Sequence, residues 1–204
     1  MKGSDMPKAT KNKRTAKRAS TIDAAWLDTH EWMLRSSSGG VSYGGFRWPR
    51  IGRWMECPDW NTRPECGGGF HGNAPEAHGY GFDYCRLELV ETRGQRIIIE
   101  GNKIKVRYAR IVAVAGDIPD EAFSRCGYTV HRAADGDIIR PVAGELWIVT
   151  AGTVTVDGQT GGDTRAYGNA TINVQASQTG GDTWADGNAT INVQASQTGG
   201  VWHS

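Results

Sequence analysis

A near-exact tandem repeat toward the C-terminus is the feature that most constrains how this chain can fold. Residues 163–181 read DTRAYGNATINVQASQTGG, and residues 182–200 read DTWADGNATINVQASQTGG. The two copies differ at two pairs of positions, Arg165/Trp184 and Tyr167/Asp186. Upstream, residues 153–162 (TVTVDGQTGG) resemble a shortened third copy. Such close repetition is typical of stacked β structure, because each unit needs neighbours above and below to cover its apolar face.

Within each copy, apolar and polar residues alternate as they do in a half-buried strand. Ile172 and Val174 alternate with Thr171 and Asn173, and the second copy repeats the pattern. This period of two predicts strands, which the Gly-rich segments separate by turns. Copies in register would align identical Thr, Asn and Gln side chains about 4.8 Å apart. A duplicated flexible linker is the alternative, and strict Ile/Val alternation disfavours it.

The number of repeats predicts self-association. Two and a half units are fewer than the roughly three that usually stand alone. A closed symmetric homo-oligomer would remove the exposed strand edges, and we favour a trimer. The residues that we expect to form the shared oligomerisation seam are Ile172, Val174, Ile191, Val193 and Trp184.

The first 20 residues form a strongly basic tail. They hold seven Lys/Arg against Asp5, a charge of 7 − 1 = +6, whereas the remaining chain holds 16 Lys/Arg against 21 Asp/Glu, or −5. We expect residues 1–20 to be flexible when free and to bind nucleic acid or an acidic partner surface. A solubilising tail is the alternative. The basic residues concerned are Lys8, Lys11, Lys13, Arg14, Lys17 and Arg18.

Between the tail and the repeats, the sequence predicts an α+β domain over residues 21–147, with the repeat segment at 148–204. Gly101-Asn102 between two apolar runs predicts an antiparallel hairpin with a two-residue loop. Short helices are expected after an N-cap at Thr21 and from Pro119 to Cys126. In the second hairpin arm, Lys103, Lys105 and Arg107 are expected to face solvent. The predicted core contains Phe46, Trp48, Leu87, Leu89, Ile98, Ile104, Val106, Ile111 and Val114. The fold class is therefore mainly β or α+β, a compact antiparallel-sheet domain followed by β-solenoid-like stacked repeats.

Residues 57–85 form a loop region rich in Gly, aromatic residues and His, where function commonly lies. The four cysteines form no Cys-x-x-Cys pair, and nothing resembles an export signal or a membrane span, so we expect reduced thiols and no membrane partner. No metal is expected. The weak alternative is a zinc site, for which the candidate ligands are Cys57, Cys66, His71 and Cys85.

Several motifs occur in an order that resembles a domain family of unknown function found in phages and prophages. They are Gly45-Phe46, residues 65–72 (ECGGGFHG), 86–91 (RLELVE), Asn102-Lys103 and 110–114 (RIVAV). Members of that family carry a Cys-x-x-Gly-Phe-His core, and many carry C-terminal arrays of small-residue β repeats. The resemblance covers about residues 39–115 and departs from the family in a Trp-rich insert around residues 54–64. It implies a phage-encoded protein and supplies no activity.

Two classes of function follow, ahead of a third in which the Thr/Asn/Gln ladder would bind a repetitive surface such as polysaccharide and which only two full rungs support. The first is a non-catalytic phage virion or assembly protein without a cofactor, such as a capsid decoration, a head fibre or a tail-associated component. Its partners would be further copies and other virion proteins, in the virion and in the host cytoplasm during assembly. The second is an enzyme similar to ADP-ribosyltransferases that uses NAD.

The enzyme alternative depends on a resemblance at two short elements. Gly69-Phe70-His71-Gly72 and Gly79-Tyr80-Gly81-Phe82 resemble elements that hold NAD in those enzymes. The resemblance implies His71 and Tyr80 as site residues, together with a catalytic glutamate that would have to come from Glu88, Glu91 or Glu100, of which Glu88 is taken first. The simpler interpretation makes His71 a structural histidine and places Glu88 and Glu91 on a solvent-facing strand surface.

Overall fold

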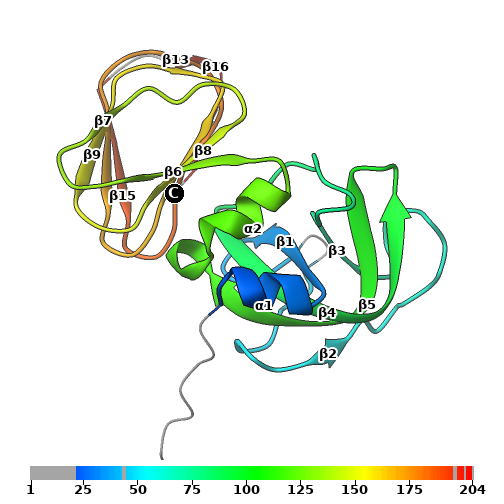
Figure 1. Cartoon of the computed structure of the whole chain (residues 1–204). Coiled ribbons are helices and arrows are strands. Elements are labelled where there is room, and N and C mark those ends of the chain that lie inside the picture. Colours follow the sequence, from blue (N-terminus) through cyan, green and yellow to red (C-terminus); the bar gives the residue numbers. More distant parts are fainter. Residues whose placement is uncertain (1–21, 43–44, 195–196, 200, 204) are drawn as a thin grey trace, which may run out of the picture.

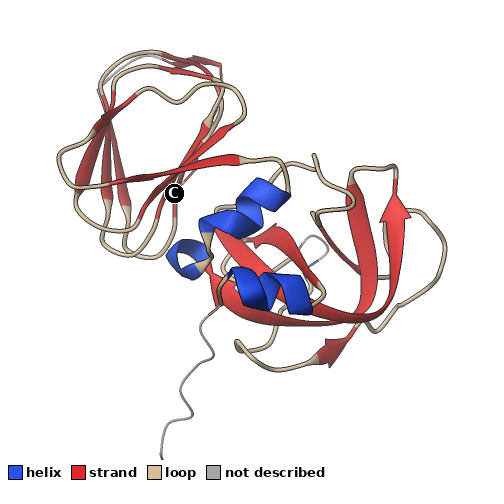
Figure 2. Cartoon of the chain, viewed as in Figure 1, coloured by secondary structure: helices blue, strands red, loops and turns tan. Residues whose placement is uncertain are grey.

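A computed structural model of the chain describes residues 22–42, 45–194, 197–199 and 201–203. The basic tail with its expected contact residues therefore lies outside the described residues. The structure is mostly β, with 47% strand and 9% helix. It combines an antiparallel-sheet domain with a parallel β-solenoid at the C-terminal end, which confirms the expected fold class (Figure 1, Figure 2).

The N-terminal domain is built on one antiparallel sheet of five strands with the order β1-β4-β5-β2, in which β3 also pairs with β5. A long hairpin of β4 and β5 forms its centre, and its register shifts between Arg93 and Arg96, on either side of Gly94. Gly94 has a φ of 85°, which bends the strand without a steric penalty. The strands are β1 (Trp32–Ser37), β2 (Met55–Glu56), β3 (Phe70–Gly72), β4 (Arg86–Ile99) and β5 (Lys103–Val114).

The predicted hairpin at Gly101-Asn102 is present, but its loop is longer than expected. Ile99 pairs with Lys103, so the loop contains three residues instead of two. Glu100 and Gly101 both have positive φ, at 51° and 73°, and the Asn102 amide donates to the Ile99 carbonyl at 3.2 Å. The extra left-handed residue is a glutamate, which the Gly-Asn signal did not indicate.

Two short helices cover the sheet domain. Helix α1 (Ala24–Thr29) is capped by Asp23, whose carboxylate accepts from the Trp26 amide at 2.9 Å; the expected cap, Thr21, lies outside the described residues. Helix α2 (Asp120–Arg125) follows Pro119, as predicted, after a short 3-10 turn (η2, Ala115–Asp117). Both helices contribute to one apolar core with β4, and that core continues into the solenoid through Leu146, Ile148 and Tyr167.

Most of the predicted core is buried, with one error inside the hairpin. Trp48, Leu87, Leu89, Ile104, Val106 and Ile111 are buried, and Phe46 and Val114 are partly buried. Ile98 is 50% exposed and does not belong to the core. The neighbouring Ile99 is fully buried, so the tip of the hairpin is covered on the side of Ile99 and not at Ile98.

The solenoid consists of about four turns whose strands stack in three parallel sheets. The sheets have the orders β6-β8-β11-β14-β17, β7-β9-β12-β15 and β10-β13-β16. The stack begins with β6 at Thr129, upstream of residue 148, because the first turn has no recognisable repeat sequence. The first turn holds β6 (Thr129–Ala133) and β7 (Ile138–Ile139). The second turn holds β8 (Glu145–Val149), β9 (Thr153–Val156) and β10 (Gln159–Thr160).

The third turn holds β11 (Asp163–Ala166), β12 (Thr171–Val174) and β13 (Gln178–Gly180). The fourth holds β14 (Thr183–Ala185), β15 (Thr190–Val193) and β16 (Gln197–Gly199), and β17 (Trp202–His203) follows it.

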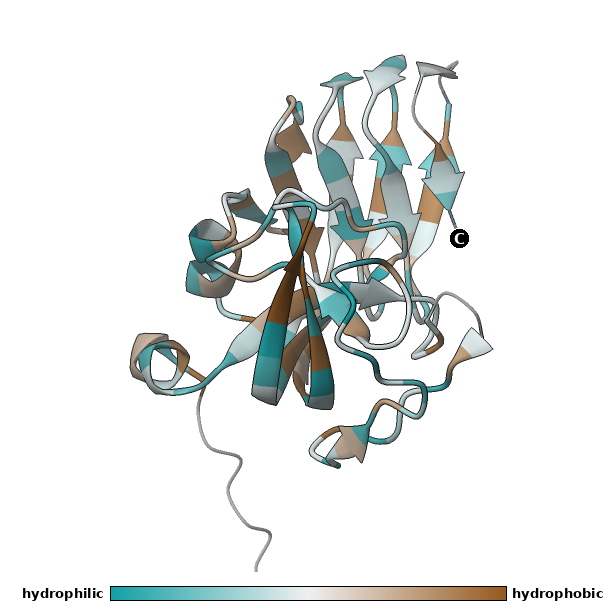
Figure 3. Cartoon of the chain, turned by 90° about the vertical axis from the view of Figure 1, so that its right-hand side faces the viewer, coloured by the Kyte–Doolittle hydropathy of each residue, from teal (hydrophilic) through white to brown (hydrophobic). Residues whose placement is uncertain are grey.

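The repeats stack in register, and this stacking buries the apolar seam within one chain. Ile172 pairs with Val154 on one side and with Ile191 on the other, and both Ile172 and Val174 are fully buried. The expectation that a single chain has too few rungs to cover them is therefore wrong, because the unrepeated upstream turns supply the missing cover. The last turn differs, because its Val193 is 38% exposed. Figure 3 shows the solenoid strands side by side, with the C-terminal end of the chain at one edge of the row.

The predicted ladder of polar side chains is present along the outer surface. The Asn192 side-chain amide donates to the Asn173 side-chain oxygen at 2.9 Å, one repeat of 19 residues apart. A second ladder is buried inside, where the Gln178 amide donates to the Gln159 side-chain oxygen at 2.8 Å and to the Thr183 hydroxyl at 2.7 Å. These bonds satisfy polar groups that the stack removes from water.

Candidate functional site

A cleft of about 760 Å³ in the sheet domain is the candidate functional site. It lies among β1, β3, the Gly-rich segment at residues 66–69 and the segment 80–84, and its volume is in the range of small-molecule sites. Its apolar wall contains the aromatic rings of Phe46, Phe70, Tyr80, Phe82 and Tyr84. Its polar wall includes Arg35, Asp59, His71 and Lys103.

Lys105, expected at the surface, is fully buried and organises one wall of the cleft. Its ammonium donates to the carbonyls of Glu65 and Gly67 and to the side-chain oxygen of Asn61, each at 3.2 Å, and also to the Arg63 carbonyl. An ammonium that is buried needs such acceptors to replace water. Lys105 therefore holds the segment from Asn61 to Gly67 against β5.

Close packing explains why glycines occupy their positions in the ECGGGFHG motif, residues 65–72. A Cβ at Gly69 would lie 2.1 Å from the Lys105 side chain, and one at Gly72 would lie 2.5 Å from the Leu34 carbonyl oxygen. At Gly68 a Cβ would lie 1.8 Å from the Asn61 side chain, and the φ there is +58°. The glycines therefore let the backbone pass close to the Lys105 side chain and its hydrogen-bond partners. By themselves they do not indicate a nucleotide-binding site.

His71 lies on β3 in the wall of the cleft, and its Nε2 is buried without a hydrogen-bond partner in the structure. Burial, together with the nearby cations of Lys103, Lys105 and Arg35, lowers the pKa of His71 to about 4, against a smaller opposing effect of Asp59. The imidazole is therefore neutral at pH 7.

Lys103, also expected at the surface, is 6% exposed and lines the same cleft. Its ammonium lies 4.1 Å from the centre of the Tyr80 ring. Tyr80 in turn donates its hydroxyl proton to Asp83 at 3.1 Å. The structure thus brings His71 and Tyr80, two residues of the enzyme alternative, together with a lysine that the alternation of β5 had placed in solvent.

Glu88, the third residue of that alternative, does not line the cleft. It is fully buried behind the cleft between Arg35 and Arg86, at 3.3 and 3.2 Å, and accepts from the Ser37 hydroxyl at 2.8 Å. Burial raises the pKa of Glu88, against the opposing effect of Arg35. Glu91 is also buried and pairs with Arg110 at 2.5 Å, so the expectation that Glu88 and Glu91 face solvent is wrong. Both carboxylates serve the core as partners of arginines.

The zinc alternative finds no assembled site among the described residues, where no group of three His, Cys, Asp or Glu side chains is placed to hold a metal ion. Cys57, Cys66 and His71 line the same cleft, but Cys85 lies beside Arg165 at the solenoid boundary. All four cysteines are free thiols. Burial raises the pKa of Cys57 to about 12, and its hydrogen bond to Asp59 adds to this, so it stays protonated at pH 7.

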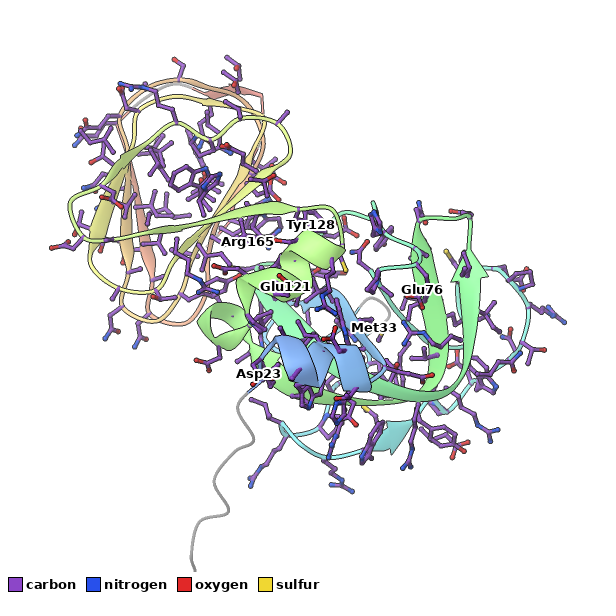
Figure 4. All side chains as sticks on the ribbon, viewed as in Figure 1. Asp23, Met33, Glu76, Glu121, Tyr128 and Arg165 are labelled. Atoms are coloured by element: carbon purple, nitrogen blue, oxygen red, sulfur yellow. The ribbon has the colours of Figure 1, made fainter. Side chains whose placement is uncertain are left out.

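A second polar constellation joins the two units, at the positions where the repeats differ. Arg165 is fully buried where the solenoid meets the sheet domain (Figure 4). Its guanidinium donates to the carbonyls of Phe82 at 2.8 Å and Cys85 at 3.1 Å, and also to that of Tyr84. The Tyr167 hydroxyl donates to the Cys85 carbonyl at 2.9 Å. The repeat alignment singled out both positions, but their role needed the fold.

Trp184, expected at the oligomer seam, is buried within the chain. Its ring stacks on His203 with the ring centres 3.5 Å apart, and the Arg165 guanidinium lies 5.2 Å from it. Trp184 therefore packs inside the single chain and does not form part of an exposed seam. Of the five expected seam residues, Ile191 and Val193 are the two in the last turn that keep apolar surface uncovered.

Comparison of the chain with known protein families, with curated proteins and with solved structures gives no match. Among the residues that the structure describes, no helix is long and apolar enough to cross a membrane.

Proposed function

We propose that this protein is a non-catalytic assembly component that associates with further copies through the last turn of its solenoid. The observation that carries this proposal is that the last turn repeats a covered one. Residues 190–193 have the same sequence, TINV, as residues 171–174, whose Ile172 and Val174 are covered on both sides. In the fourth turn the equivalent Ile191 is partly exposed and Val193 is 38% exposed.

A second copy is the occupant that fits this end best. Among the described residues, β15 pairs with β12 on one side and has an open edge on the other. An open strand edge pairs readily with another strand, and identical ends can face each other around a two-fold axis. Because end faces close in pairs, we propose a dimer in place of the trimer expected from a shared seam.

The setting that we propose is a phage particle, as a capsid decoration, head fibre or tail-associated component, with other virion proteins as partners. The support for this setting is the motif resemblance over about residues 39–115 together with the C-terminal repeats. In that setting the tail at residues 1–20, with its charge of +6, contacts nucleic acid or an acidic partner surface.

The test is the mass of the full chain in solution, measured by light scattering over a range of concentrations. We expect an oligomer for the unchanged protein and a monomer for Ile191→Asp and Val193→Asp, because a charge cannot enter an apolar contact without a partner. Ile98→Asp is the control, since Ile98 is an exposed isoleucine at a hairpin tip remote from the stack. An unchanged protein that stays monomeric at all concentrations would contradict the proposal.

A further inference from the structure

We propose that the cleft of the sheet domain binds a small organic anion with a flat apolar body, whose anionic group pairs with the ammonium of Lys103. The first observation is that this lysine has no counter-ion. It is 6% exposed, and within the described residues it makes no salt bridge or hydrogen bond, its one polar interaction being with the Tyr80 ring at 4.1 Å. The Lys103 side chain packs in the cleft wall while its ammonium keeps access to the cleft, where it can pair with an entering anion.

The carboxylates in the cleft wall are already engaged elsewhere. Asp59 accepts from the Cys57 thiol at 2.9 Å, and Asp83 accepts from the Tyr80 hydroxyl at 3.1 Å. Glu88, behind the wall, is paired with Arg35 and Arg86. The charges nearest to His71 are mainly cations, those of Lys103, Lys105 and Arg35, with Asp59 opposing them. Of these cations, Lys103 lines the cleft without a carboxylate in salt-bridge contact, so it is the one that can pair with an entering anion.

His71 supplies a second polar contact. Its Nε2 is buried without a partner, although the ring lies in the wall of the cleft. A neutral imidazole has one nitrogen that donates and one that accepts, so it can bind either a phosphate oxygen or a hydroxyl.

The remaining wall determines the body of the ligand. The rings of Phe46, Phe70, Tyr80 and Phe82 line the cleft, and aromatic side chains favour planar partners that stack or pack edge-on. A volume of about 760 Å³ holds a ring system together with its anionic group. Nucleotides and aromatic carboxylates share this chemistry.

Calorimetric titration of the full chain tests the proposal with four probes: adenosine monophosphate, benzoate, adenosine and inorganic phosphate. We expect one of the two ring-bearing anions to bind at least ten times more tightly than adenosine or phosphate, and the stronger of the two identifies the source of the anion. In Lys103→Met the affinity for that anion should fall at least tenfold, while the weak binding of adenosine stays unchanged. Arg140→Met, which removes an exposed charge from the solenoid, is the control and should bind as the unchanged protein does.

A second measurement uses the unchanged protein, in case Lys103→Met does not fold. The ring nitrogens of His71 should shift in the NMR spectrum when the preferred anion is added, and should shift little with adenosine. Failure of both anions to bind at millimolar concentration would overturn the proposal. So would equal affinity of Lys103→Met and the unchanged protein, or a His71 signal that stays constant at saturation.

Discussion

The two copies of the 19-residue repeat have almost the same sequence and occupy different environments. In the first copy, Ile172 and Val174 are fully buried between a turn on each side. In the second copy, Ile191 is partly exposed and Val193 is 38% exposed, because the stack ends there. The comparison teaches that burial in a solenoid depends on the neighbouring turns, so an identical residue contributes differently at the middle and at the end.

The two pairs of positions that differ between the copies lie where the first copy contacts the sheet domain. Arg165 and Tyr167 donate to backbone carbonyls of the segment 82–85. At the equivalent positions of the second copy, Trp184 stacks on His203, and the Asp186 side chain accepts from the next backbone amide, that of Gly187, at 3.0 Å. Sequence difference and structural role therefore coincide at these positions.

The largest expected effect comes from placing a charge at the same position of each copy. Ile172→Asp buries an unpaired carboxylate and should lower the free energy of unfolding by about 4 kcal/mol or more, enough to unfold the solenoid. Ile191→Asp should cost the single chain less than half of that, because water reaches the last turn. Chemical denaturation followed by circular dichroism, at a concentration where the chain is monomeric, measures both. Equal losses would show that the two copies are equally covered.

A smaller effect is expected at the contact between the units. Arg165→Met removes the donor to the carbonyls of Phe82 and Tyr84, while the Cys85 carbonyl keeps the Tyr167 hydroxyl. It should lower the free energy of unfolding by about 3 kcal/mol, since each unsatisfied buried group costs about 1–3 kcal/mol. Denaturation should then show two transitions in place of one, as the solenoid and the sheet domain lose their connection. Arg140→Met, at an exposed ion pair, should change the free energy by less than about 0.5 kcal/mol. If Arg165→Met also changed the free energy of unfolding by less than about 0.5 kcal/mol, Arg165 would not stabilise the contact between the solenoid and the sheet domain.

The smallest effect is expected from removing one methylene group at the same position of each copy. Ile172→Val should cost about 1 kcal/mol, whereas Ile191→Val should cost a few tenths of that in the monomer. Thermal unfolding at low and at high protein concentration separates the proposed assembly from the single chain. If copies stack end to end, the cost at Ile191 should rise toward that at Ile172 as concentration increases. A concentration-independent difference would count against stacking through this end.

Much of the fold was predictable because repeats, alternation and turn residues are local signals. The stacked strands, the β4-β5 hairpin and both short helices were predicted from such patterns. The first solenoid turn was not, since β6 and β7 share the architecture of the repeats without their sequence. Its strands are recognised only by their register with β8 and β9.

The candidate site was less predictable because alternation along β5 assumes that one face meets water. Lys103 and Lys105 lie on that face, yet residues 57–69 cover Lys105 and the cleft encloses Lys103. Glu88 is hidden in the same way by Arg35 and Arg86. His71 and Tyr80 were found from a motif, but the burial of the charged residues around them depends on a long loop that carries no periodic signal.

The solenoid contacts the sheet domain through its side and not through its last turn, so turns can be added at its C-terminal end. The hydrogen bonds of Arg165 and Tyr167 to the segment 82–85 come from the third turn, while the fourth turn has the same register and the same outer ladder. A duplication of the coding segment for one repeat would therefore add a turn of about 4.8 Å at the free end without disturbing this joint. Such a chain can be lengthened by whole turns of the solenoid. The near identity of its last two copies is what a recent duplication of this kind would leave.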